Sequence, residues 1–298
     1  MARFVPEGTH TALVTPMCED DVRSLDVPAL KALVEQQIAG GVDGLVACGT
    51  TGETSTLSDD EYQTVIATVV QQAAGRVPVI AGVGSNSTAK TVQTTRIANQ
   101  FGIDGVLVVT PYYNKPTQQG MVAHFRAVAE ASTTPVVLYN VPGRTGVNLL
   151  PASVAELAKH PNIVALKEAA GNLEQIQETL RLTQFGFAVL SGEDALCVPT
   201  YAVGGRGVIS VVSNVAPALT AALWRDHHAG RADAAARGQV ALLALIRTLF
   251  SEPNPQPCKR AMHLLGIMAP VTRMPLLTAT DATRAALARE LAALGLVA

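Results

Sequence analysis

The stretch IVALKEA, residues 163–169, has the pattern of a buried β-strand that carries a lysine near its end. Four apolar residues in a row are typical of a strand covered on both faces, as in a parallel sheet. Lysine is almost never fully buried unless it is paired or used in chemistry. From this stretch alone, Lys167 fits two interpretations equally: a lysine whose ammonium group reaches solvent at a barrel rim, or an amine nucleophile. An apolar setting would lower the pKa of the amine from about 10.4, freeing its lone pair to attack a carbonyl carbon.

Similar apolar runs recur along the chain. There are eight, each followed by polar or small residues: 11–15, 44–48, 78–83, 105–110, 135–139, 163–167, 187–190 and 207–212. Between them lie segments with helical spacing of apolar residues: 27–38, 58–70, 87–101, 118–131, 151–159, 172–182 and 194–203. This alternation, with a period of roughly thirty residues, predicts βα units around a parallel sheet. Eight units favour a closed (β/α)8 TIM barrel, with an open doubly wound sheet as the alternative.

The alternation ends near residue 214, and the pattern from 217 to 298 is helical throughout. A helix near 218–228 would complete the barrel, so we predict a catalytic barrel over 1–230 and a small C-terminal all-helical appendage over 231–298. The stretch SEPNPQP, residues 251–257, predicts a rigid turn between two helices because proline fixes φ. Alanine-rich helices of this kind usually serve packing or assembly, so we expect no catalytic residue there.

Composition and charge argue against several classes of protein. The chain has 298 residues with 22 Lys and Arg against 24 Asp and Glu, so no excess of positive charge indicates nucleic-acid binding. The four cysteines form no Cys-x-x-Cys pair, which argues against a zinc site or a disulfide framework. No apolar run approaches the roughly 18 residues of a membrane span, and the N-terminus has no apolar signal core. We therefore expect a cytoplasmic protein without membrane or nucleic-acid partners.

In a (β/α)8 barrel the active site lies at the carboxyl ends of the strands, so the residues that follow each run are the candidates. They supply hydroxyls, phenols, one arginine and one lysine, in the segments 49–53, 111–114, 139–146, 167–168, 191–194 and 209–210. Such a set can bind a small α-keto acid, form an imine and transfer protons. Purely structural interpretations exist as well: a tight turn at 49–52, a packing pair at Tyr112 and Tyr113, and a surface charge at Arg144. No Gly-x-Ser-x-Gly elbow or histidine cluster with metal-ligand spacing indicates a hydrolase or a metal site.

Four motifs resemble the dihydrodipicolinate synthase family, class I aldolase-type barrels of the N-acetylneuraminate lyase superfamily. They are GTTGE at 49–53, TPYYN at 110–114, YNVPGRTG at 139–146 and ALKEA at 165–169, and their order and spacing agree with the family. The resemblance runs from about residue 8 through 271. It implies a lyase that condenses pyruvate with L-aspartate 4-semialdehyde to 4-hydroxy-tetrahydrodipicolinate in diaminopimelate and lysine biosynthesis. Alternatives are an N-acetylneuraminate lyase, a 2-keto-3-deoxy sugar-acid aldolase, or a barrel without activity that serves as a binding protein.

The resemblance also implies the catalytic residues. Lys167 would form a covalent imine with pyruvate, so that neither a cofactor nor a metal is needed. Tyr139 would relay protons to and from the imine. Thr50 would link Tyr139 to Tyr113, which in this family reaches into the site of the neighbouring subunit. The family is expected to assemble as a homotetramer built from two dimers, although some relatives stop at dimers.

Four further positions match the substrate-binding residues of the family. Thr51 and the adjacent backbone amides would hold the carboxylate of pyruvate. Arg144 would hold the carboxylate of the second substrate, because the fork of a guanidinium matches both oxygens. Gly192 and Ile209 would line the pocket. The two consecutive threonines and the position of Arg144 favour the synthase over the sugar-acid enzymes.

Many members of the family are inhibited by lysine at a cleft on the dimer interface. Two positions match the sensitive members, Asn86 and Tyr112. Lys90 stands where those members have a glutamate, and Tyr62 where they have a histidine or an acid. A second ammonium group would repel that of the ligand, so we predict that lysine inhibits weakly or not at all. The alternative is that Lys90 turns to solvent and Asp59 or Glu61 supplies the acid.

Overall fold

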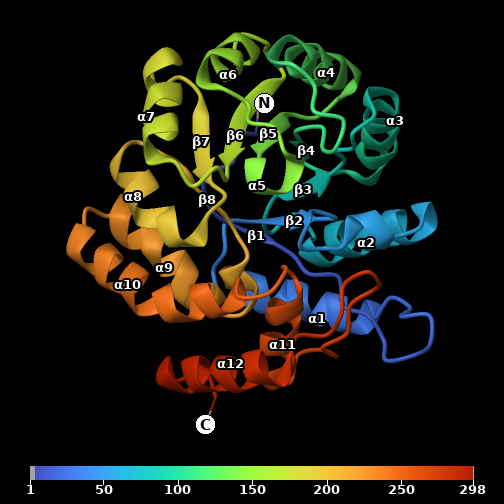
Figure 1. The fold of residues 1–298 in the computed structure, drawn as a ribbon, viewed down its shortest axis with the longest axis vertical. Coiled ribbons are helices and arrows are strands. Elements are labelled where there is room, and N and C mark those ends of the chain that lie inside the picture. Colours follow the sequence, from blue (N-terminus) through green and yellow to red (C-terminus); the bar gives the residue numbers. More distant parts are fainter. Residues whose placement is uncertain (1–3, 298) are drawn as a thin grey trace.

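The computed structural model describes residues 4–297, and its strands form a closed parallel barrel surrounded by helices (Figure 1). Strand order around the barrel follows the sequence, and the eighth strand pairs with the first to close it. The prediction of a (β/α)8 barrel with a C-terminal helical appendage is therefore confirmed, and the open doubly wound sheet is wrong.

The strands occupy the predicted runs with one exception. Their bounds are β1 Gly8–Ala12, β2 Gly44–Ala47, β3 Val79–Gly82, β4 Gly105–Val109, β5 Val136–Asn140, β6 Ile163–Glu168, β7 Ala188–Ser191 and β8 Gly207–Ser210. The first strand was expected at 11–15 and lies at 8–12. This strand has no apolar pattern, because Thr9 and Thr11 at its buried centre are polar. Asp43 accepts a hydrogen bond from the Thr9 backbone amide over 2.7 Å, and Thr11 Oγ1 donates to Gln37 Oε1 over 2.7 Å.

The helices follow the predicted segments. They are α1 Val27–Ala39, α2 Asp59–Ala73, α3 Thr88–Ala98, α4 Gln118–Ala131, α6 Pro151–Leu157, α7 Leu173–Leu182, α8 Cys197–Ala202 and α9 Pro217–His228. The start of α2 has a capping box, in which Ser58 Oγ accepts from the Glu61 amide and the Glu61 carboxylate accepts from the Ser58 amide. The short α5, Pro142–Thr145, was not predicted, since one turn is too short to show a periodic pattern.

Three more helices follow the barrel: α10 Ala232–Leu249, α11 Gln256–Leu264 and α12 Asp281–Ala293. The expected turn at 251–257 lies between α10 and the body of α11. Helix α10 packs against α9 and α8, and α12 packs against α10 and α11, on one side of the barrel (orange to red in Figure 1). Their apolar side chains belong to the cluster that also lines the barrel helices. The division into 1–230 and 231–298 stays a prediction.

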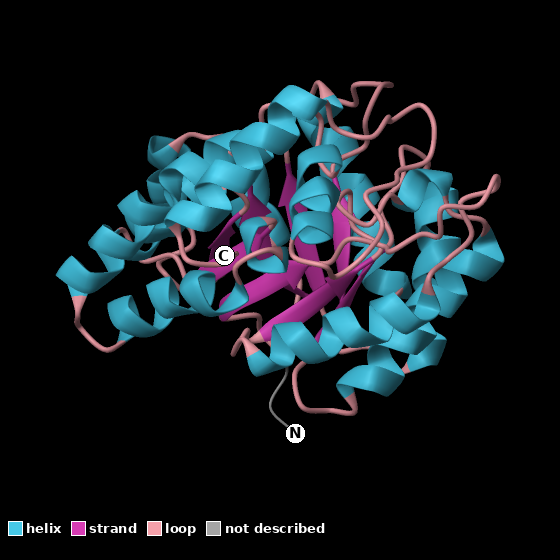
Figure 2. Ribbon diagram, turned by 90° about the horizontal axis from the view of Figure 1, so that it is seen from below, coloured by secondary structure: helices cyan, strands magenta, loops and turns pink. Residues whose placement is uncertain are grey.

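Two apolar clusters make up the core, and the strands lie between them. Helices enclose the strands (Figure 2), and the larger cluster lies between the two. The smaller one fills the barrel interior and includes Val137 and Tyr139 of β5, Ala165 of β6 and Ile209 of β8. Side chains alternate along a strand, so Lys167, two residues after Ala165, also faces the interior. In the part of the chain that the structure describes, no helix is both long and apolar enough to span a membrane.

Candidate active site

Lys167 points into the barrel at the carboxyl end of β6. Its side chain is buried, with 5% of the residue exposed, and Nζ lies 4.2 Å from the ring centre of Tyr139. The sheet register brings the two residues together, because Tyr139 of β5 pairs directly with Lys167 of β6. Lys167 therefore does not extend to solvent, and its amine lies against a phenol.

The surroundings of Lys167 raise the fraction of neutral amine above that of a lysine in water. Burial lowers the pKa of Lys167 from 10.5 to about 8. The positive charge of Arg144 also lowers this pKa, whereas the negative charges of Asp194 and Glu193 raise it. Burial removes the water that stabilises an ammonium ion. With a pKa near 8, roughly a tenth of the molecules carry a neutral amine at pH 7, and the neutral form is the nucleophile.

Tyr139 supplies a protonated phenol beside this amine. Burial raises the pKa of Tyr139 to about 12, while Arg144 and a hydrogen bond from Thr50 lower it. Thr50 follows β2, so the hydroxyl of one strand end reaches the phenol of another. A phenol held in this way can donate a proton to a reacting atom and recover it through the neighbouring hydroxyl.

Two buried acids fix the backbone around Lys167, and sequence reasoning assigned no role to either. Asp194 accepts hydrogen bonds from Ser210 Oγ at 2.5 Å and from the Val211 amide at 3.0 Å, which ties the end of β7 to the end of β8. Glu168 accepts from the side chains of Asn140 and Gln175. Both acids follow apolar runs, and this position is the only feature of the sequence that could have indicated that they lie near the site.

Gly192 lies beside Lys167, and Ile209 belongs to the interior cluster that includes Tyr139. A methyl group placed on Gly192 would lie 2.7 Å from Ala169 Cβ and 3.1 Å from Lys167 Cε, so a larger residue would displace the lysine. Ile209 is 1% exposed and belongs to the same interior cluster as Tyr139. Both residues therefore shape the space in which the amine sits.

Arg144 and Thr50 line a cavity of about 410 Å³. Arg144 is on the short helix α5, directly after β5. Tyr62, Lys90, Tyr112 and Asp59 of the predicted lysine cleft line the same cavity, while Asn86, Lys167 and Tyr139 do not. The catalytic face and the cleft are thus neighbours within one chain.

Thr51 and Tyr113 have opposite environments. Thr51 is 3% exposed, and its hydroxyl accepts a hydrogen bond from Asn254, a residue that sequence reasoning placed outside the site. Tyr113 is 87% exposed and has a left-handed backbone with φ 75°. Its phenol makes no hydrogen bond to any residue in the range 4–297, so within one chain Thr50 does not link Tyr139 to Tyr113.

The described residues offer no ready-made metal centre. No group of three or more His, Cys, Asp or Glu side chains within 4–297 is arranged to hold an ion. Cys18, Cys48, Cys197 and Cys258 are free thiols. Near the amine of Lys167 the barrel presents the phenol of Tyr139 and the guanidinium of Arg144.

Fold and site together define the class of protein: a (β/α)8-barrel enzyme with a buried amine beside a phenol at its catalytic face. A family model described as the dihydrodipicolinate synthetase family matches residues 5–294. A 4-hydroxy-tetrahydrodipicolinate synthase from Geotalea daltonii is 50% identical over 278 residues, which cover 93% of this chain and 95% of that protein. The chain belongs to the dihydrodipicolinate synthetase family and is a lyase.

Solved structures of the family superpose on nearly the whole chain. The dihydrodipicolinate synthase of Thermotoga maritima matches with a TM-score of 0.96 at 40% identity, covering 99% of this chain and 100% of that one. The chloride-inhibited dihydrodipicolinate synthase of Acinetobacter baumannii, complexed with pyruvate, matches with a TM-score of 0.95 at 39% identity, covering 98% of this chain and 99% of that one.

Proposed function

We propose that this enzyme condenses pyruvate with L-aspartate 4-semialdehyde to give 4-hydroxy-tetrahydrodipicolinate. The observation that supports this most is the buried amine of Lys167, with its lowered pKa, 4.2 Å from the ring centre of Tyr139. The names of the relatives support the same reaction, and the pyruvate complex of one of them supports the first substrate.

The reaction begins with an imine. The neutral amine of Lys167 attacks the keto carbon of pyruvate, and the carbonyl oxygen leaves as water after two proton transfers. The imine makes the methyl group of pyruvate acidic, because nitrogen accepts the electron pair when a proton leaves. Tyr139 gives and receives these protons with Thr50 as its partner, and such assistance contributes about 10²–10⁴-fold in rate. No cofactor is required, because the imine itself stores the electron pair.

The second half of the reaction joins the two substrates. The enamine carbon attacks the aldehyde carbon of the semialdehyde, and the aldehyde oxygen takes up a proton. The amino group of the semialdehyde then attacks the imine carbon, which closes the ring and releases Lys167 as an amine. In this scheme Thr51 and the amides around it hold the pyruvate carboxylate, and Arg144 holds the carboxylate of the semialdehyde.

Trapping with borohydride tests the proposal. With pyruvate and borohydride, the wild-type chain should gain the mass of reduced pyruvate on Lys167. Lys167→Ala and Lys167→Arg should gain nothing, since a guanidinium does not deprotonate near neutral pH. A matched control is Lys31→Ala, which removes an exposed lysine of α1. Turnover with aspartate semialdehyde, compared with N-acetylneuraminate, separates the synthase from the lyase of the same superfamily.

We infer that Tyr113 works on a neighbouring subunit, within a homotetramer of two dimers or within a dimer. The side chain of Tyr113 is 87% exposed on a left-handed backbone, which leaves its phenol free to contact another subunit. We also propose that the enzyme is located in the cytoplasm, because its four cysteines are free thiols, as is usual in a reducing compartment.

We also propose that lysine inhibits this enzyme weakly or not at all. Lys90 lines the cavity where the ammonium group of lysine would need an acid. Glu61 is not free to supply one, because Arg273 pairs with it and lowers the pKa of the Glu61 carboxyl to about 2. The Tyr62 hydroxyl donates to the Gly82 carbonyl over 2.9 Å, so it too is engaged. Asp59 remains the one acid of this segment on the cavity wall.

A further inference from the structure

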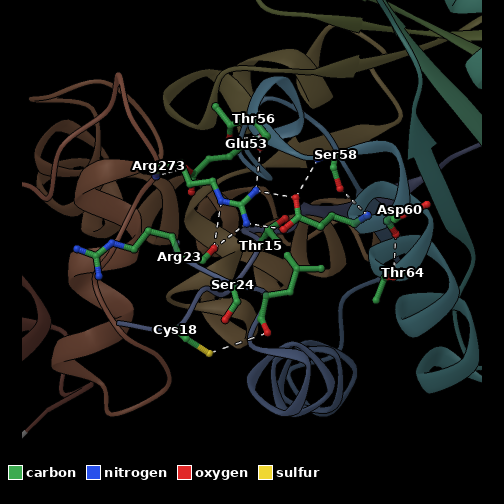
Figure 3. Close-up of polar contacts among 12 residues, drawn as sticks. Thr15, Cys18, Arg23, Ser24, Glu53, Thr56, Ser58, Asp60, Thr64 and Arg273 are labelled. Atoms are coloured by element: carbon green, nitrogen blue, oxygen red, sulfur yellow. Dashed lines mark hydrogen bonds and ion pairs between the residues drawn. The ribbon is translucent and has the colours of Figure 1, made fainter. Parts of the chain in front are cut away.

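Side chains from the C-terminal appendage hold the loop at 49–56, which follows β2. Asn254 Nδ2 donates to Thr51 Oγ1 over 2.9 Å, and Lys259 Nζ lies 2.5 Å from Glu53 Oε1. Arg273 donates from its amide to Glu53 Oε2 over 3.0 Å and from its guanidinium to the Thr56 carbonyl over 2.8 Å (Figure 3). The partners are more than 200 residues apart along the chain, so the appendage reaches back to the catalytic face.

The ion pair in this cluster favours a fixed geometry. Lys259 is 0% exposed and Glu53 is 4% exposed, so both charges are removed from water. A buried pair contributes little net stability, because desolvation offsets most of the attraction, but it is costly to break and therefore holds its partners in place. Glu53 also has a left-handed backbone with φ 53°, which needs support from its surroundings. Thr51, two residues earlier, is thereby kept in one position.

The hydrogen bond from Asn254 determines what the Thr51 hydroxyl can offer. A hydroxyl has one hydrogen to donate and lone pairs to accept with. Since Asn254 donates to the oxygen, the hydrogen of Thr51 stays available, and it has no acceptor among residues 4–297. Asn254 is itself 5% exposed, and its Oδ1 has no hydrogen-bond partner in the same range. The arrangement leaves one donor ready for an anion.

We propose that Asn254 is a positioning residue that directs the hydrogen of Thr51 toward the carboxylate of the bound keto acid. This inference rests on the proposed function, in which Thr51 binds that carboxylate. It gives the appendage a part in substrate binding, where its composition suggested only packing or assembly.

The test compares Asn254→Asp with Asn254→Ala. An aspartate can only accept, so it would take the hydrogen of Thr51 and also place a negative charge near the keto-acid carboxylate. We expect the KM for pyruvate to rise by about tenfold or more in Asn254→Asp and by a smaller factor in Asn254→Ala, since a charge-assisted hydrogen bond is lost. The KM for the semialdehyde should stay within about twofold, because Arg144 binds that substrate. Asn99→Asp, which alters an asparagine of the α3 end bonded to Ser132 and Thr134, controls for the change of charge.

A double-mutant cycle separates positioning from a general loss of structure. Thr51→Val removes the hydroxyl, and adding Asn254→Ala to it should raise the KM for pyruvate no further. Additive effects in the cycle, or an unchanged KM in folded Asn254→Asp, would overturn the proposal. Thermal unfolding checks the fold, and if Asn254→Asp does not fold, the cycle with alanine and valine decides.

The proposed function and the role of Asn254 can be refuted separately. If wild-type enzyme is not trapped on Lys167 by pyruvate and borohydride, the proposed function is wrong. If wild-type enzyme is trapped, and the Asn254 variants are trapped with the same dependence on pyruvate concentration, only the role of Asn254 is wrong.

Discussion

Replacing Lys167 with methionine should stabilise the fold at neutral pH while removing imine formation. Methionine keeps an unbranched apolar side chain of similar length but carries no charge. Burial lowers the pKa of Lys167 from 10.5 to about 8. Each pH unit corresponds to about 1.36 kcal/mol, so burying the ammonium form costs about 3 kcal/mol. The lowered pKa already includes the attraction of Asp194 and Glu193 for the ammonium group.

The dependence on pH separates charge from packing. Below pH 8 the lysine is protonated in both the folded and the unfolded state, and the full cost applies. Between about 8 and 10.5 the unfolded state binds more protons than the folded state, so the stability of the wild type rises with pH. Above 10.5 both states are neutral and the cost is gone. The advantage of Lys167→Met should therefore be about 3 kcal/mol at pH 7 and fall toward zero near pH 10.5.

Urea unfolding of wild type and Lys167→Met at pH 7 and at pH 10 measures this difference. Both proteins are compared at one concentration, because subunit association also contributes to stability. Lys31→Met, which removes an exposed lysine, should change the free energy of unfolding by less than about 0.5 kcal/mol at either pH. The reasoning is refuted if Lys167→Met is no more stable than wild type at pH 7. A gain of equal size at both pH values would also refute it, because packing alone would then explain the effect.

Three further predictions concern activity. The rate of imine trapping should rise about tenfold per pH unit up to about pH 8 and then level off, because burial lowers the pKa of Lys167 to about 8. A flat profile between pH 6 and 8 would contradict this prediction. Mixing inactive Lys167→Ala and Tyr113→Phe subunits should restore part of the activity, since hybrid dimers contain one complete site; lack of rescue after confirmed subunit exchange would place Tyr113 in its own chain's site. Lys90→Glu should lower the lysine concentration for half-inhibition by tenfold or more, with Lys31→Glu as the control; half-inhibition of the wild type below millimolar lysine would contradict the premise.

Several features could be predicted from the sequence because they depend on residues close together in the chain. The alternation of apolar runs and helical spacings reports which faces are buried, and it predicted the barrel. The capped start of α2 is local in the same sense, because Ser58 and Glu61 lie three residues apart, which is the spacing of a capping box. Lys167 near the end of an apolar run indicated a candidate nucleophile near the carboxyl end of β6, while the structure decided that its amine is buried and does not reach solvent.

Other features depend on partners that no local pattern reveals. Strand β1 was misplaced because Thr9 and Thr11 are buried polar residues, and the partners of the Thr9 backbone amide and the Thr11 hydroxyl, Asp43 and Gln37, lie 34 and 26 residues away. The family resemblance pointed to Thr51, yet nothing in the stretch around Asn254 indicated that the two would meet.

The barrel, the ends of most strands and the candidate nucleophile could thus be predicted from the sequence, because apolar residues that are buried on one face recur at regular intervals along the chain. The partners of the polar groups in the core, in contrast, became known only from the folded arrangement. A buried donor or acceptor needs one partner at a hydrogen-bonding distance, whatever its position in the chain, and Lys259 finds Glu53 across more than 200 residues.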